Sequence, residues 1–165
     1  MVHIHHMNGM NGSETESITA LLGEFTRSCL LTRTRRISRV ITGIYDEALR
    51  PFGVNSPQFS LLALIARLNG ASRAEIARAN FQERSTLSRN LAHLLNEGWV
   101  EEVTPKGGRS RPVLITAAGK ELLISAGGAW RAAQKRATQL LGDDGVGAIV
   151  EAADRLPVEV LGESA

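Results

Sequence analysis

The stretch from Ala71 to Val103, "ASRAEIARANFQERSTLSRNLAHLLNEGWVEEV", restricts the fold of this 165-residue chain more than any other feature. Leucines recur in it at helical spacing among polar, Arg- and Ser-bearing residues, and the pattern stops at "GWV". Ser72, with Glu75 three positions later, forms a capping box that opens a short helix over 73–80. A brief turn separates this helix from a second one that begins near Glu83. Two helices joined in this way predict a helix-turn-helix.

The second helix is amphipathic when its residues are placed at about 100° per residue. Its apolar face consists of Leu87, Leu91, Leu94 and Leu95, and its opposite face carries Ser85, Thr86, Arg89, Ala92, His93 and Asn96. Small residues let a helix enter the major groove, and hydroxyl and guanidinium groups donate hydrogen bonds to phosphates and base edges. Taken alone, such a helix is most often an ordinary surface helix, so the order of the elements has to support a reading role.

A basic hairpin follows. Trp99–Thr104 and Val113–Thr116 are β-prone runs separated by the glycine-containing turn "PKGGRSR". Lys106, Arg109 and Arg111 lie at or beside its tip, and the two arginines, two positions apart, point to the same side of a strand. This arrangement predicts a basic wing that reaches the flanking minor groove.

On the N-terminal side, residues 1–17 are polar and lack periodicity, which predicts a disordered tail. Residues 18–49 have apolar positions at helical spacing, which predicts one long helix or two helices in line. Ser56 is expected to cap the next helix, with Pro57 at its first position.

On the C-terminal side, Thr116 is expected to cap a helix that runs to about Leu141. Asp143 or Asp144 is expected to cap a last helix, which Pro157 stops. The predicted order is therefore four helices, a β-hairpin and two further helices.

Composition excludes several classes of protein. No apolar run approaches the roughly 18–20 residues of a membrane span, and the N-terminus has no secretion signal, so we expect a cytoplasmic protein. A single cysteine, Cys29, excludes an internal disulfide. No catalytic, phosphate-binding or metal-binding motif is present, and His93 is the sole histidine outside the tail, so we expect neither an enzyme nor a cofactor. The formal charge is only +2, yet five arginines and no carboxylate stand between Arg27 and Arg39.

At this point the chain resembles the MarR family of winged helix-turn-helix regulators. The resemblance is carried by "SPQFSLLALIARL", "AEIARANFQERSTLSRNLAHLLNEGWVEEV" and "RSRPVLITAAGKEL" and extends over about residues 18–157. It implies a mainly α fold with a small β-hairpin wing (α+β), and a homodimer whose first and last helices interlace. The implied organisation is a tail (1–17), dimerisation helices (18–50 and 117–157), a DNA-binding lobe (51–116) and a C-terminal tail (158–165).

The resemblance also assigns residues to DNA. The family's major-groove positions fall on Arg84, Ser85, Thr86, Ser88 and Arg89. Its wing arginine falls on Arg109, and Lys106 and Arg111 lie beside it. The family often has Asp-x-Arg at the wing, and the aspartate position reads Gly107 here, so the carboxylate that braces the wing is missing. The implied partner is double-stranded DNA with a pseudo-palindromic operator, and the implied role is that of a repressor.

Two kinds of switch are typical of the family. The resemblance implies a repressor that is released from DNA by a small aromatic acid or phenol. The candidate residues for binding such a ligand are Arg36, Tyr45, Phe59 and Trp130. Aromatic residues at helical spacing more often serve packing, so packing remains the alternative. Cys29 offers a peroxide-sensing alternative, because Arg27 and Arg33 favour a thiolate. A winged-helix module that binds protein instead of DNA is a further alternative.

Overall fold

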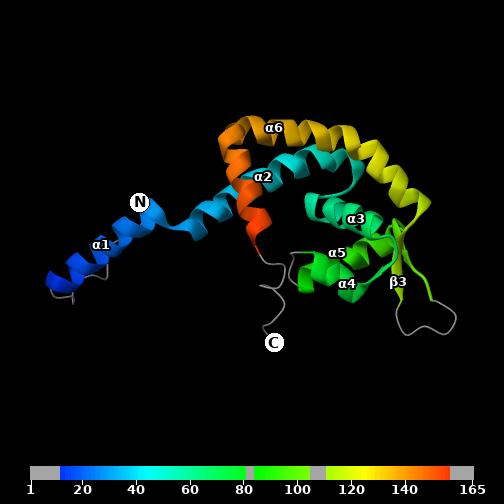
Figure 1. The fold of residues 1–165 in the computed structure, drawn as a ribbon, viewed down its shortest axis with the longest axis horizontal. Helices are drawn as coiled ribbons and strands as arrows, with labels where there is room; N and C mark the ends of the chain where they lie inside the picture. Colours follow the sequence, from blue (N-terminus) through cyan, green and yellow to red (C-terminus); the bar gives the residue numbers. More distant parts are fainter. Residues whose placement is uncertain (1–11, 81–83, 105–110, 157–165) are drawn as a thin grey trace. The chain divides into compact units, whose positions relative to one another are not determined.

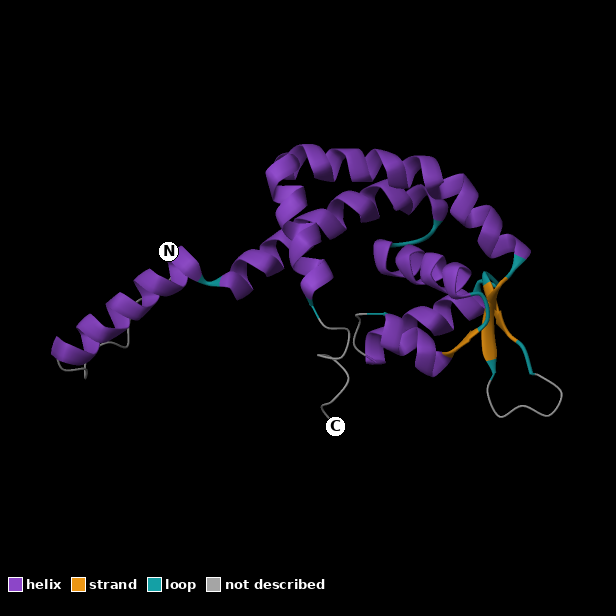
Figure 2. Ribbon diagram, in the orientation of Figure 1, coloured by secondary structure: helices purple, strands orange, loops and turns teal. Residues whose placement is uncertain are grey.

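The computed structural model describes residues 12–80, 84–104 and 111–156. It is mostly helical with one small antiparallel sheet, as Figures 1 and 2 show, and this confirms the predicted fold class. The chain divides into two compact units, residues 1–40 and 41–165. In chain order the elements are α1 (Gly12–Ser28), α2 (Leu30–Leu49), the 3-10 turn η1 (Arg50–Phe52), α3 (Ser56–Leu68), β1 (Ala71–Ser72), α4 (Arg73–Ala79), α5 (Arg84–Asn96), β2 (Val100–Glu102), β3 (Pro112–Ile115) and α6 (Ala117–Arg155).

The first unit contains α1 and the beginning of α2, which are separated by a break at Cys29. Helix α1 begins at Gly12, so the predicted tail of residues 1–17 is wrong for its last six residues; residues 1–11 lie outside the described residues. Glu14 in the first turn favours the helix through the macrodipole, and the Ser17 hydroxyl donates to the Ser13 carbonyl. No residue from 12 to 40 is buried.

Helix α3 is capped one residue earlier than the sequence predicts. The side-chain oxygen of Asn55 accepts from the Gln58 backbone N–H at 2.9 Å, and the Gln58 side-chain oxygen accepts from the Asn55 N–H at 3.0 Å. Ser56 is therefore the first helical residue, and its own N–H donates to Asp46 at 2.7 Å. Asparagine caps as well as serine does, and the reciprocal bond from Gln58 decides between the two neighbours.

The sheet has the order β1-β3-β2, with all neighbours antiparallel. The hairpin of β2 and β3 is as predicted, but β1 is an addition: Ala71 pairs with Val113 and Ser72 with Pro112. Two residues are too few to give a pattern in sequence. The main core lies between this sheet and α3, α4 and α5, and its buried members are Leu61, Leu62, Ile65, Ala71, Ile76, Leu87, Leu91, Leu94, Val100 and Val113.

Helix α6 is capped by Thr116, as predicted, through a bond of 3.1 Å from the Gly119 N–H to the threonine oxygen. Its helical geometry is interrupted at Gly142, where φ is 68° and ψ is 164°. The expected division into two helices is therefore made by a glycine with positive φ, and Asp143 and Asp144 follow the break in place of capping it. Helix α6 ends at Arg155; Pro157 lies outside the described residues.

Helix α6 has apolar residues at helical spacing between Leu122 and Leu140, and only some of them are buried. Ala126, Ala133 and Ala137 are buried, whereas Trp130 and Leu140 are exposed. Ile44 of α2 clusters with the second and third of these alanines, so small side chains let α2 and α6 approach closely there. None of the helices in the described parts of the chain is both long and apolar enough to cross a membrane.

Candidate nucleic-acid interface and ligand cavity

Helix α4 is fixed at its start by the capping box that the sequence predicts. The Ser72 hydroxyl oxygen accepts from the Glu75 N–H at 3.3 Å, and the Glu75 carboxylate accepts from the Ser72 N–H at 2.7 Å. These bonds from Ser72 also lower the pKa of Glu75. Because Ser72 pairs with β3 as well, the cap ties the first helix of the motif to the wing.

Helix α5 rests on a leucine face that is buried as predicted. Leu87, Leu91 and Leu94 are all part of the main core, and Leu95 packs against it partly buried. Helix α5 contacts both α3 and β2. This anchoring fixes the rotation of α5 about its own axis, so the opposite face points outward.

The outward face carries the hydroxyl and arginine side chains of the first turns. Ser85, Ser88 and Arg89 are exposed and Thr86 is half-buried. The Arg89 Nε–H donates to the Ser85 carbonyl at 3.3 Å, and one guanidinium nitrogen lies 3.5 Å from the Thr86 hydroxyl. The arginine therefore lies back along the first turn. Arg84 begins the helix, but its side chain lies outside the described residues.

His93 departs from the expected polar face. Its ring meets the Trp99 ring edge-on, with centroids 5.7 Å apart and planes at 80°. Its Nε2 atom is buried and has no hydrogen-bond partner among the described residues. His93 is therefore part of the packing between the end of α5 and the start of the hairpin. Trp99 in turn packs against both the main core and the cluster around Leu49 and Phe59.

The base of the wing is held by groups far apart in sequence. Val100 pairs with Ile115 and Glu102 with Val113. Arg73 of α4 forms an ion pair with Glu102, and the hydrogen bond from Arg73 lowers the pKa of that carboxyl. Sequence reasoning missed this pair because no local pattern joins residues 29 positions apart.

The wing tip itself, residues 105–110, lies outside the described residues, and with it Lys106, Gly107 and Arg109. Arg111 is described, is exposed, and lies directly before β3. Its charge contributes to the lowered pKa of Glu102. A carboxylate is therefore present at the wing base although the expected position at the tip is a glycine.

The return from the wing into α6 depends on close backbone contacts. The Thr116 hydroxyl donates to the Gly98 carbonyl at 2.7 Å, and the Thr116 N–H donates to the Trp99 carbonyl at 3.0 Å. Gly119 lies against the same carbonyl, so a Cβ atom there would overlap it. Threonine and glycine in "TAAG" thus lock α6 onto the turn that follows α5.

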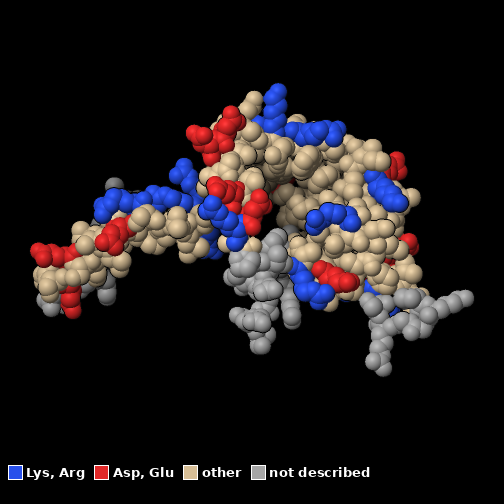
Figure 3. Space-filling model, in the orientation of Figure 1, with Lys and Arg blue, Asp and Glu red and all other residues tan. Residues whose placement is uncertain are grey.

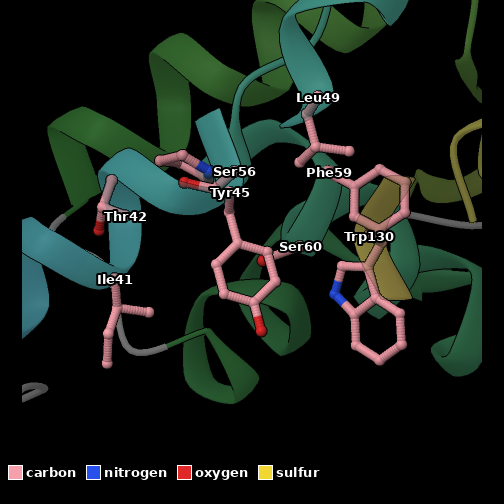
Figure 4. A pocket seen from close by; sticks show the side chains of 9 residues that line it. Ile41, Thr42, Tyr45, Leu49, Ser56, Phe59, Ser60 and Trp130 are labelled. Carbon is pink, nitrogen blue, oxygen red and sulfur yellow. The ribbon is translucent and has the colours of Figure 1, made fainter. Parts of the chain in front are cut away.

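A cavity of about 370 Å³ lies in the second unit between α2, α3 and α6 (Figure 4). Its lining consists of Ile41, Thr42, Tyr45, Leu49, Ser56, Pro57, Phe59, Ser60 and Trp130. Three of the four predicted ligand residues, Tyr45, Phe59 and Trp130, are thus brought together. Arg36 is not among the lining residues and belongs to the unit of residues 1–40.

The cavity is apolar with a few hydroxyl groups and no charged side chain among its lining residues. The Tyr45 hydroxyl bonds to the Gln134 side-chain oxygen of α6. Burial raises the pKa of Tyr45, so its hydroxyl remains a proton donor at neutral pH. Such a cavity is suited to a small planar molecule with a polar edge.

Cys29 lies at the break between α1 and α2. The Thr32 hydroxyl donates to its sulfur at 3.4 Å, and this bond, together with the charge of Arg33, lowers the pKa of the thiol. Arg27 does not contribute to that shift. Among the described residues, no group of three His, Cys, Asp or Glu side chains is placed to hold a metal ion.

Known proteins match both the motif and the fold. The family model for the MarR family matches residues 52–110. The HTH-type transcriptional repressor Rv2887 of Mycobacterium tuberculosis is 31% identical over 102 residues, which are 61% of this chain and 73% of that protein. The chain belongs to the MarR family. The predicted resemblance to the MarR family is therefore confirmed. The proteins of this family are regulators of transcription without enzymatic activity.

Solved structures of MarR-family proteins agree. The M. tuberculosis regulator MosR is 32% identical, with a TM-score of 0.64 and coverage of 79% of this chain and 98% of that chain. A MosR structure in complex with DNA has 34% identity, a TM-score of 0.63, and coverage of 78% and 100%. Rv2887 in complex with salicylic acid has 27% identity, a TM-score of 0.61, and coverage of 79% and 97%.

Proposed function

We propose that this MarR-family protein is a homodimeric, cytoplasmic transcriptional repressor that reads double-stranded DNA with α5. The observation that carries the proposal is that α5 has one buried apolar face and one exposed polar face. Leu87 and Leu91 bury one face in the core, and Ser88 and Arg89 hold the other out to solvent. Arginine binds guanine with two hydrogen bonds, and hydroxyls bind phosphates or bases.

The proposed DNA contacts extend from α5 to the wing. Arg84, Ser85, Thr86, Ser88 and Arg89 address the major groove, and Lys106, Arg109 and Arg111 address the flanking backbone and minor groove. The position of Arg111 at the base of β3, beside the braced Glu102, supports a wing that projects from a fixed root. Two copies would read half-sites about one duplex turn, roughly 34 Å, apart.

The proposed effector is a small aromatic acid or phenol bound in the cavity. Phe59 and Trp130 offer ring faces, and Tyr45 offers a hydroxyl oxygen that can accept a hydrogen bond while its proton is donated to Gln134. Rv2887 is solved with salicylic acid and with p-aminosalicylic acid, which supports this ligand class. The lining itself provides no cation for a carboxylate, and Arg36, the fourth predicted ligand residue, belongs to the other unit.

The test is selection of preferred sites from random DNA duplexes by the full-length protein, followed by release assays with salicylic acid and with phenol. We expect enrichment of an inverted repeat and release at millimolar or lower concentrations of the acid. Failure to enrich any sequence would contradict DNA reading and favour the protein-interaction module. Enrichment without release by either compound would retain the repressor and reject the effector.

A peroxide switch at Cys29 is the second candidate, supported by the lowered pKa of its thiol. Release of the selected DNA by an organic hydroperoxide is compared between the parent protein and Cys29→Ser. Loss of release in the variant would establish the switch, and release that persists would rule it out.

A further inference from the structure

Charged side chains gather at the root of the wing, on one side of the sheet. Residues that face each other across antiparallel strands share a side of the sheet, and so do residues two positions apart. Glu102 pairs with Val113, which is buried, so Glu102 lies on the side that packs against the helices. The bond from the Val103 N–H to the Pro112 carbonyl continues the ladder, so Arg111 lies on that side as well, next to Glu102.

Arg73, the first residue of α4, adds a second arginine beside the same carboxylate. Its Nε–H donates to Glu102, whose side chain is only 20% exposed, whereas the Arg73 side chain is 56% exposed. The two terminal nitrogens of the Arg73 guanidinium group make no hydrogen bond to any residue that the structure describes. Glu102 therefore holds the guanidinium group by one nitrogen and leaves the other two available to a ligand.

The available nitrogens suit a phosphate of the DNA backbone. Arginine binds phosphate through two parallel N–H bonds. In a helix-turn-helix the second helix lies in the major groove and the first helix crosses the backbone, here α5 and α4. If the wing enters the neighbouring minor groove, the phosphates that separate the two grooves pass beside the wing root, where α4 begins at Arg73.

We propose that Arg73 binds a backbone phosphate between the two grooves and that Glu102 is its positioning residue. This inference rests on the proposed function, because it concerns the DNA that α5 reads, and it adds to the interface a residue that the sequence did not assign to DNA. The guanidinium groups of Arg73 and Arg111 and the single carboxylate of Glu102 leave a formal charge of +1 in the cluster. The excess positive charge favours an anion although an acid is present.

The distribution of surface charge does not locate this contact by itself. In Figure 3 the basic side chains of the second unit are scattered among acidic ones, without one continuous basic patch on the face shown. A solitary surface arginine loses side-chain freedom when it binds a ligand. Arg73 differs because its bond to Glu102 orders the guanidinium group before DNA arrives, so less entropy is lost on binding.

The experiment measures the affinity of the full chain for the selected operator and for a random-sequence duplex at several salt concentrations. For Arg73→Ala we expect affinity to fall at least about tenfold, as for the loss of a hydrogen bond between charged groups. The slope of log affinity against log salt should fall by about one unit. A phosphate contact carries no sequence information, so both duplexes should respond alike. Arg131→Ala on α6 removes the same charge elsewhere and should bind like the parent.

Two substitutions of Glu102 test the positioning role. Glu102→Ala and Glu102→Gln remove the same charge, but only glutamine keeps a side-chain oxygen that can accept from the Arg73 Nε–H. We expect the alanine form to bind both duplexes about 2- to 10-fold more weakly than the glutamine form, which is the range for one hydrogen bond. Equal affinity of the two forms would overturn the positioning role.

A brace that acts on the wing alone predicts a different result. If Arg73 worked only through Glu102, Arg73→Ala would change nothing further in the Glu102→Ala background, whereas a phosphate contact predicts a lower salt slope there as well. Circular dichroism checks that every variant keeps the parent's helix content. An unchanged slope for Arg73→Ala in either background would overturn the phosphate contact while the parent still reads its operator. Absence of an enriched operator would contradict sequence reading, and the random-sequence duplex would still test Arg73, so the two proposals fail separately.

Discussion

Substitution of Gly119 by alanine tests how tightly α6 is joined to the turn after the reading helix. The added Cβ would overlap the Trp99 carbonyl oxygen and lie 2.8 Å from the Ile115 side chain, where real Cβ atoms essentially never approach. Overpacking of this kind costs about 1–3 kcal/mol, and the rigid backbone carbonyl sets the upper end. Alanine in a helix gains about 1 kcal/mol over glycine. The net expectation is a loss of about 2 kcal/mol in the free energy of unfolding, which is the difference of these two magnitudes.

The matched control is Gly128→Ala on the same helix. A Cβ at Gly128 meets no atom within 4 Å, so only the helix-propensity gain of up to about 1 kcal/mol remains. Urea unfolding of both variants and the parent, at one protein concentration, gives the midpoints and slopes. We expect the midpoint to fall for Gly119→Ala and to rise for Gly128→Ala. Equal midpoints for the two variants would refute the steric argument and the close approach on which it depends.

Three further predictions concern the DNA-reading face and the wing. Arg89→Ala should lose about 1–3 kcal/mol of binding free energy for the selected operator in a titration, whereas Arg131→Ala on α6 should bind like the parent. Equal affinity of the two variants would contradict the proposal that Arg89 contacts DNA. Lys106→Ala should reduce the slope of log affinity against log salt by about one unit, and an unchanged slope would remove it from the phosphate contacts. Because its pKa is lowered in the folded state, Glu102 adds stability above its unfolded pKa of about 4.3, and that stability disappears as the pH falls through the folded value. Arg73→Ala should therefore be less stable than the parent at pH 7 in thermal unfolding, with the difference shrinking below about pH 4; a constant difference would contradict the ion pair.

The sequence predicted the two helices of the motif and the hairpin well because their signals are local. The capping box of Ser72 and Glu75 involves residues three apart, and the leucine face of α5 repeats every three or four residues. Both are properties of a single helix, so no knowledge of distant contacts is needed. Asn55 and Ser56 are both residue types that cap helices, so the residue types alone do not show which of the two is the cap. The reciprocal side-chain bond from Gln58 makes Asn55 the cap.

The sequence predicted the interruption of α6 at nearly the right position but assigned it to the wrong residue. Aspartates after a glycine indicate a helix start, so the sequence predicted that Asp143 or Asp144 would cap a new helix. In the structure the break lies at Gly142, which adopts a positive φ, and the two aspartates follow it. The tail was misjudged at its C-terminal end for a related reason. Residues 12–17 carry no apolar period, and their helix is favoured by Glu14 in its first turn.

The sequence by itself determined which helices form, where the hairpin lies, and which side of α5 is apolar, because each depends on residues close together along the chain. Only the tertiary structure decided that Arg73 braces Glu102, that His93 packs on Trp99, and that three of the four predicted ligand residues line one cavity. These contacts join side chains that lie on different elements, and in two of the three cases the residues are tens of positions apart. Their existence depends on how the elements pack, which local periodicity does not encode.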